Sequence, residues 1–291
     1  MYSVKKKIHC YPPKDITGKG IGIAVLDTGI CPMDDFVLPQ NRIIEFRDFV
    51  NNIDTPYDDN GHGTHVAGIA ASNGILSDGI YSGIAPQSNI ISLKILDEAG
   101  HGTLFWALEA VKWVIENKNK YNIRVVNMSI GTNDKTISPA LLNAAKSLFI
   151  SEITVCAAAG NENCCRISAP GTSPYVITAG SIEEMVRFKL KSNNSYYIKP
   201  DVFAPSENII SCKADGFSFS ASNRSSDKTV DEHYISMSGT SMATPMVSAA
   251  AALLYQYNTY FSPKDIKRIF AKSIVSTNGI LNIENLFKFA K

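Results

Sequence analysis

The chain has 291 residues, of which 45% are hydrophobic, and its formal net charge at pH 7 is +1. This balance gives no basic surplus that would favour a nucleic acid or a membrane surface as a partner. No apolar run reaches the roughly 18 residues that a membrane-spanning helix needs, and no signal-peptide core follows Met1 to Lys7. We expect a cytoplasmic protein, or a secreted one if the chain is a trimmed mature form; the oligomeric state stays open.

Strand-like apolar runs alternate with helical periods through the first 180 residues. The predicted strands are 21–26, 89–96, 123–129, 153–159 and 175–179, and the predicted helices are 62–71, 103–118 and 139–149. This alternation is typical of βαβ units around a mostly parallel sheet. No repeat or linker interrupts it, so we predict a single α/β domain over residues 1–291.

The remaining segments are less regular. Residues 30–60 predict loops with short strands, and 186–190 with 196–198 predict a hairpin around residues 192–195. Residues 213–233 are polar and serine-rich, which is typical of a surface loop or a small hairpin. Three helical pieces follow, namely a buried helix at 246–257, an amphipathic surface helix at 263–273 and a short last piece at 285–290.

The six cysteines show no metal-binding spacing. They are Cys10, Cys31, Cys156, Cys164, Cys165 and Cys212, and they contain no C-x-x-C pair. In a reducing cytosol we expect all of them to be free thiols.

The first predicted strand ends in Asp27-Thr28-Gly29. A carboxylate at the carboxyl end of a central strand lies where open α/β enzymes keep their sites. The alternative is an Asx-turn that only closes the strand. Asp27 is therefore a candidate functional residue that needs partners elsewhere in the chain.

His62 lies in the first turn of the small-residue helix that follows Gly61. His65 comes three residues later, a spacing that raises the question of a metal site. The His-Glu-x-x-His pattern is absent, and nothing nearby completes a ligand set. We therefore predict no metal here.

Ser241 lies in Gly-Thr-Ser-Met-Ala-Thr-Pro, residues 239–245, just before the apolar run 246–257. This places Ser241 at a helix N-terminus, where free N–H groups and the helix dipole favour negative charge. Pro245 suits the first helical turn, where its missing N–H costs nothing. Seen alone, the serine would be an N-cap on a core helix.

Asp27, His62 and Ser241 together suit nucleophilic catalysis. A serine hydroxyl is a poor nucleophile until a neutral imidazole takes its proton. A carboxylate holds the imidazole in the required tautomer and stabilises the cation that forms.

Three motifs carry a resemblance to the subtilisin family of serine endopeptidases: Val-Leu-Asp-Thr-Gly-Ile at 25–30, Gly-His-Gly-Thr-His-Val-Ala-Gly at 61–68 and Ser-Gly-Thr-Ser-Met-Ala-Thr-Pro at 238–245. Supporting matches extend from about residue 18 to 272. The resemblance implies a three-layer α/β/α sandwich that hydrolyses peptide bonds of proteins through an acyl-enzyme. It implies that Asp27 is the orienting carboxylate, His62 the general base and Ser241 the nucleophile.

The resemblance also implies that Asn161 is the side-chain donor of the oxyanion hole, together with the backbone N–H of Ser241. An amide N–H₂ aimed at a developing oxyanion would stabilise the tetrahedral intermediate. The alternative is a turn residue after a strand. His65 corresponds to a structural histidine of the family.

Two segments are implied to hold the substrate backbone as an added strand, residues 96–102 and 129–131. Glycines in them suit close backbone approach. The first specificity pocket would be walled by 129–131 and 158–160, with Glu162 at its rim and Ser168 near its floor. The predicted substrate-binding residues are Leu96, Gly100, Gly102, Ser129, Ile130, Gly131, Ala158, Ala159, Gly160, Glu162 and Ser168.

Several features depart from the family pattern. Met246 stands where the family has histidine, and the 213–233 loop is longer than usual. The loop at 73–82 lacks the family's calcium-ligand spacing, with Asp78 alone as a carboxylate. The chemistry needs no cofactor, and a structural calcium stays open. We expect no inhibitory prodomain, because the stretch ahead of the first motif is too short for one. A catalytically silent binding module and a processing enzyme for one partner protein remain alternatives.

Overall fold

The computed structural model describes residues 1–161, 166–192, 195–215 and 227–291. Within them, the central sheet contains β1 (Gly22–Asp27), β2 (Ile43–Asp48), β3 (Asn89–Lys94), β4 (Ile123–Met128), β5 (Thr154–Ala158), β6 (Ile177–Ser181) and β9 (Val202–Ala204). The strands lie in the order β2-β3-β1-β4-β5-β6-β9, and each neighbouring pair is parallel. The predicted parallel sheet is confirmed.

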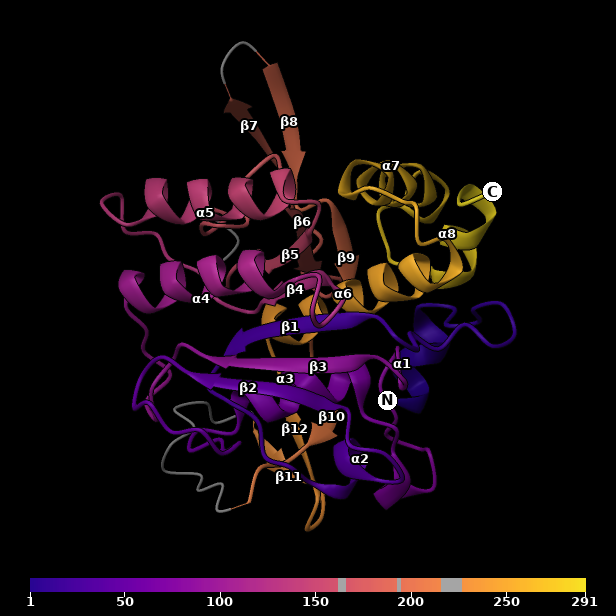
Figure 1. Cartoon of the computed structure of the whole chain (residues 1–291). Helices are drawn as coiled ribbons and strands as arrows, with labels where there is room; N and C mark the ends of the chain where they lie inside the picture. Colours follow the sequence, from indigo (N-terminus) through magenta and orange to yellow (C-terminus); the bar gives the residue numbers. More distant parts are fainter. Residues whose placement is uncertain (162–165, 193–194, 216–226) are drawn as a thin grey trace.

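Helices cover both faces of this sheet (Figure 1). One face carries α3 (His62–Ala71) and α6 (Thr240–Tyr257), and the other carries α4 (Leu104–Asn117) and α5 (Ser138–Ile150). Along β1, Ile23 and Val25 join the first core while Ala24 and Leu26 join the second. Successive strand residues point to opposite faces, so burial of both faces explains the continuous apolar run. The three-layer α/β/α sandwich is confirmed.

Smaller elements surround this framework. A hairpin of β7 (Phe188–Ser192) and β8 (Ser195–Lys199) projects from the body, as predicted (Figure 1). A second sheet has the order β10 (Ile209–Cys212), β12 (Tyr234–Met237) and β11 (Lys228–Thr229). The segment 213–233 therefore contributes one short strand, β11, which pairs antiparallel with β12 just after the segment. Its residues 216–226 lie outside the described part.

The remaining helices are α1 (Tyr2–Lys7), α2 (Asp34–Val37), α7 (Pro263–Ser273) and α8 (Ile283–Phe289), with short 3₁₀ turns η1 (Ile75–Ser77) and η2 (Val275–Thr277). Helix α7 has the predicted bounds. Across the described residues, no helix combines the length and apolar character needed to cross a bilayer.

Helix α6 differs from its prediction. It begins at Thr240 rather than near Met246, so Pro245 lies beyond the first turn, inside the helix. A proline cannot donate to the carbonyl four residues before it, which here is that of Ser241. The hydroxyl of Ser129 donates to this carbonyl instead, at 2.9 Å. The interior proline thus leaves an acceptor that ties α6 to the segment after β4.

Candidate active site

The candidate residues gather at the carboxyl edge of the central sheet. Asp27 ends β1, Leu96 comes just after β3, Ser129 follows β4, and Gly160 and Asn161 follow β5. The carboxyl ends of parallel strands lie at one edge of the sheet. Here β1 lies between β3 and β4, and the strand order runs outward from β1 in both directions, which is where open α/β sheets place their sites. A cavity of about 780 Å³ opens at this edge.

The contact between Asp27 and His62 joins β1 to the first residue of α3. Nδ1 of His62 lies 2.7 Å from Oδ1 of Asp27, which also accepts from the backbone N–H of Thr28 at 2.8 Å. An ionised carboxylate only accepts, so Nδ1 carries the proton of this hydrogen bond. In neutral His62 the basic nitrogen is therefore Nε2.

Gly61 and Gly63 allow α3 to begin so close to β1. Gly61 precedes the helix with a φ of +93°, in the left-handed region that glycine tolerates. A Cβ on Gly63 would lie 2.3 Å from the carbonyl oxygen of Gly29. The backbone N–H of Gly63 instead donates to Oγ1 of Thr28, at 2.8 Å. The Gly-His-Gly sequence is thus what brings the imidazole to Asp27.

His65 lies on α3 but has a different environment. Its side chain is fully buried, and Nε2 donates to the carbonyls of Ile209 and Ile235, at 2.9 and 3.2 Å. Burial lowers the pKa of His65 to about 3. A neutral histidine that links α3 to β10 and β12 fits the predicted structural role.

Ser241 is the second residue of α6. Its Oγ donates to the backbone oxygen of Ser129 at 3.2 Å, and its carbonyl accepts from Oγ of Ser129. The first N–H groups of a helix have no acceptor within the helix. The backbone N–H of Ser241 therefore lies among the groups that a bound oxyanion could use.

Asn161 is held by the residue that precedes Ser241. Its Oδ1 accepts from the backbone N–H of Thr240 at 2.8 Å and from Oγ1 of Thr240 at 3.0 Å. A backbone N–H only donates, so the atom that faces Thr240 must be the amide oxygen. The N–H₂ group of Asn161 consequently faces away from Thr240, and Asn161 lines the cavity together with His62 and Ser241.

Nearly all of the predicted substrate-binding residues that the structure describes line the same cavity. They are Leu96, Gly100, Gly102, Ser129, Ile130, Gly131, Ala158, Gly160 and Ser168. Ala159 is not among its lining residues. The N–H of Ala159 donates to the carbonyl of Ala179, and its carbonyl accepts from the N–H of Ser168, both at 2.9 Å. Glu162 lies outside the described residues.

Ser168 lies between the two predicted walls. A Cβ on Gly131 would lie 2.8 Å from Cβ of Ser168, and one on Gly160 would lie 2.7 Å from its Oγ. Both glycines are therefore needed for the close approach of Ser168 to the walls.

Comparison with known proteins places this geometry in a family. The model of the subtilase family matches residues 18–287. The chain belongs to the subtilase family.

Similar proteins and structures support this membership. The subtilase is 39% identical to serine protease AprX of Bacillus subtilis (strain 168) over 274 residues, 87% of this chain and 61% of that protein. It is 32% identical to subtilisin BL of Lederbergia lenta, over 93% of this chain and 92% of that protein. A crystal structure of a cold-adapted subtilisin-like serine proteinase superposes with a TM-score of 0.66 at 28% identity, covering 92% of this chain and 90% of that one.

The coverage of the relatives differs. The subtilase spans 61% of the length of AprX and 54% of the thermophilic serine proteinase of Bacillus sp. (strain AK1), to which it is 35% identical over 82% of its own length.

The buried His65 predicts a pH-dependent stability of this subtilase. In the unfolded chain a histidine has a pKa of about 6.5, whereas folding lowers the pKa of His65 to about 3. As pH falls below about 6.5, the unfolded state gains a proton that the native state does not bind. The free energy of unfolding should therefore decrease, by up to about 1.4 kcal/mol per pH unit from this residue.

His65→Gln retains an N–H₂ donor for the two carbonyls but does not titrate. Denaturant unfolding from about pH 7 to about pH 5 should give a shallower decrease in this variant. Equal slopes in both proteins would show that His65 does not remain neutral in the native state.

The cysteines agree with the thiol prediction where they are described. Cys10, Cys31, Cys156 and Cys212 are free. Cys164 and Cys165 lie outside the described residues.

The side chains of the loop 73–82 offer few ligands for a calcium ion. Its carboxylate, Asp78, is exposed, and Nζ of Lys5 donates to Oγ of Ser82 at 2.6 Å. An ammonium group beside the loop opposes a second cation, and calcium prefers six or more oxygen ligands. In the described part of the chain, no group of three or more His, Cys, Asp or Glu side chains is placed to hold a metal.

Sequence reasoning missed three residues near the cavity. Thr240 holds the oxygen of Asn161, Asn60 lines the cavity beside His62, and Lys94 is buried at the end of β3. Lys94 left one signal in the sequence, since it is the one charged residue of β3 and ends that strand.

Proposed function

We propose that this subtilase is a serine endopeptidase that hydrolyses peptide bonds of proteins. The observation that carries the proposal is the 2.7 Å contact of His62 Nδ1 with Asp27, at a cavity that Ser241 also lines. The relatives named serine protease and subtilisin support the same reaction.

In the proposed acylation step, Oγ of Ser241 attacks the scissile carbonyl carbon and its proton passes to Nε2 of His62. The C–N bond then breaks, and His62 gives this proton to the leaving amine. In deacylation, His62 takes a proton from water, the hydroxide adds to the ester, and Ser241 leaves with the proton. Asp27 remains ionised and stabilises the imidazolium. These reaction steps need no cofactor.

The tetrahedral intermediates carry a negative oxygen, for which we assign two donors. These are the N–H₂ group of Asn161 and the backbone N–H of Ser241. The donors are fixed before the reaction, because Thr240 holds the amide oxygen of Asn161 and α6 holds the backbone of Ser241. Preorganised donors of this kind stabilise charge without a cost of reorientation.

The proposed substrate is an extended segment of protein that lies between residues 96–102 and 129–131. Its backbone would pair with both edges, and its side chains would enter the pockets between them. The small Ser168, near the floor, leaves room for a bulky side chain next to the scissile bond. Leu96 already forms an isolated antiparallel bridge with Gly102, which shapes the first edge.

Labelling with a fluorophosphonate probe tests this proposal, because the probe reacts with activated serines. We expect one adduct, located on Ser241 by peptide mass spectrometry. Ser241→Ala should not label, and His62→Ala should label far more slowly because no base takes the proton. A folded wild-type protein that does not label would contradict the proposal and favour a catalytically silent binding module.

A further inference from the structure

Lys94 is a buried charge next to the proposed catalytic residues. It is the last residue of β3 and pairs in register with Asp27 of β1. Its side chain is 0% exposed, although it ends at the edge of the sheet where the cavity opens. Burying an ammonium group is costly unless it is paired and hydrogen-bonded, so the partners of Lys94 must offset this cost.

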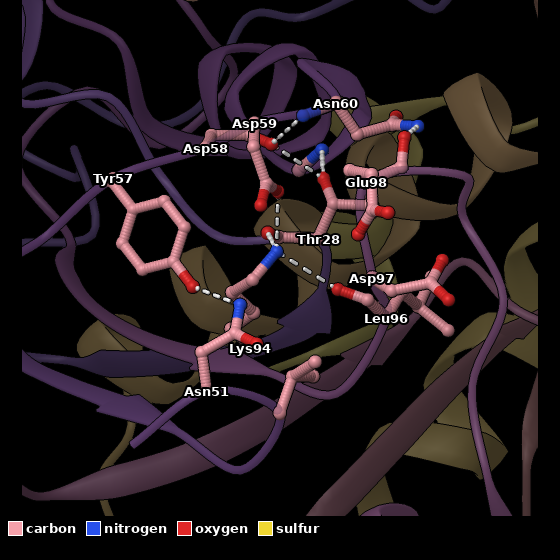
Figure 2. Close-up of polar contacts among 12 residues, drawn as sticks. Thr28, Asn51, Tyr57, Asp58, Asp59, Asn60, Lys94, Leu96, Asp97 and Glu98 are labelled. Atoms are coloured by element: carbon pink, nitrogen blue, oxygen red, sulfur yellow. Dashed lines mark hydrogen bonds and ion pairs between the residues drawn. The ribbon is translucent and has the colours of Figure 1, made fainter. Parts of the chain in front are cut away.

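Figure 2 shows that Nζ of Lys94 reaches three separate segments. It donates to the carbonyl of Thr28 at 2.7 Å, to Oδ1 of Asp59 at 2.5 Å and to the carbonyl of Leu96 at 3.0 Å. An ammonium group has three N–H donors, so each of them has an acceptor. The three acceptors belong to the end of β1, the loop before His62 and the first residue of the segment 96–102.

A second contact joins the same loop to the same segment. Nδ2 of Asn60 donates to the carbonyl of Glu98 at 2.9 Å (Figure 2). Within the segment, Oδ1 of Asp97 accepts from the backbone N–H groups of Ala99 and His101, at 3.0 and 2.8 Å. The turn is therefore ordered by its own contacts, and Lys94 and Asn60 connect it to the His62 loop.

We propose that Lys94 is a positioning residue for extended substrates. It fixes the distance between the His62 loop and the edge 96–102, along which we place the substrate backbone. This inference rests on the proposed function, and Lys94 itself touches no reacting atom. Lys94 is the fully buried member of this ion pair, whereas the side chain of Asp59 is 32% exposed. Separating the two would leave the charge of Lys94 without its ionic partner in the interior.

The proposal predicts that Lys94→Met affects long substrates more than short ones. Methionine keeps an unbranched side chain but removes the ammonium group that joins the three segments. We expect kcat/KM for a tetrapeptide ester to fall roughly 10-fold or more, mainly through a higher KM, since small misplacements of a binding edge are costly. A single-residue ester with the same first residue and leaving group should change less than about 3-fold, because it does not reach the edge.

Rates are expressed per site labelled by the fluorophosphonate probe, so that unfolded protein does not enter them. Lys199→Met is the matched control. Lys199 is 1% exposed and donates to Asp201 at 2.5 Å, to Val176 at 2.7 Å and to Thr178 at 2.8 Å, and it does not line the cavity. This variant should lose stability as Lys94→Met does, but keep the wild-type ratio of the two kcat/KM values.

If Lys94→Met does not fold, Asp59→Asn provides the second variant. Asparagine keeps an acceptor for Lys94 but removes the charge, so the same selective loss should be smaller. Equal fold-losses on both esters, which leave the ratio of the two kcat/KM values unchanged, would overturn the positioning role. The same change of this ratio in Lys199→Met would also overturn it. A wild-type protein that neither labels nor hydrolyses either ester would instead overturn the proposed function.

Discussion

Substituting Asp27 by asparagine is expected to lower kcat for peptide hydrolysis by roughly 10⁴, a size carried over from other serine proteases rather than derived from these distances. Oδ1 of Asp27 accepts from both Thr28 and His62. An asparagine that turns its N–H₂ toward His62 would place the proton on Nε2, so the imidazole could not accept one from Ser241. An asparagine in the other orientation would still lack the charge that stabilises the imidazolium.

Steady-state kinetics of Asp27→Asn and of the wild type measure this effect, with the concentration of active sites determined for the wild type. Asp35→Asn is a suitable control, since Asp35 is also fully buried and accepts from Ser72 at 2.7 Å and from Tyr234 at 2.8 Å. It lies outside the residues that line the cavity, so it should lower stability and leave kcat unchanged. A loss of less than about 10-fold in Asp27→Asn would contradict the orienting role.

Asn161→Ala is expected to lower kcat by roughly 10²–10³ with KM nearly unchanged, a size taken over from the corresponding donor in subtilisin. The side chain would act only when the carbonyl oxygen has moved and become charged. Its loss should therefore hardly change the affinity for the substrate in the ground state. Steady-state kinetics on a peptide substrate separate the two parameters.

Asn161→Asp distinguishes the donor role from the structural one. Aspartate keeps the oxygen that accepts from Thr240, but it replaces the N–H₂ group by a negative oxygen. We expect this variant to be at least as impaired as Asn161→Ala, because like charges repel. If Asn161→Ala instead raised KM severalfold at constant kcat, the residue would be a ground-state contact.

The layered fold was predictable because local patterns agree with it. The apolar run of β1 indicated a strand buried on both faces, and strand–helix alternation indicated parallel pairing. The order of the sheet was not predictable from such patterns, since it depends on which crossovers pack together. The edge strand β2 was expected only as one of several short strands between residues 30 and 60, because its pattern is interrupted by charged residues. Helix α1 was not predicted, since its short polar sequence has little periodicity, although Val4 packs in the core.

The geometry of the candidate site was predictable where chemistry restricts residue type. Asp27 and His62 were identified by their roles, and the structure places them in contact. Contacts made by common residues were not predictable. Nothing in the spacing of Asp59 and Lys94 indicates an ion pair, because 35 positions and a strand crossover separate them. Thr240 likewise resembles any threonine at the start of a helix until Asn161 is placed beside it.

The interior position of Pro245 also has a consequence for how α6, the helix of Ser241, is held. Were residue 245 to carry an N–H, the helix would offer its own donor to the carbonyl of Ser241, in competition with the hydroxyl of Ser129. Proline removes that competitor, so the acceptor remains available to a residue from another part of the chain. A position that is unfavourable for the helix alone therefore protects a contact between α6 and the segment after β4.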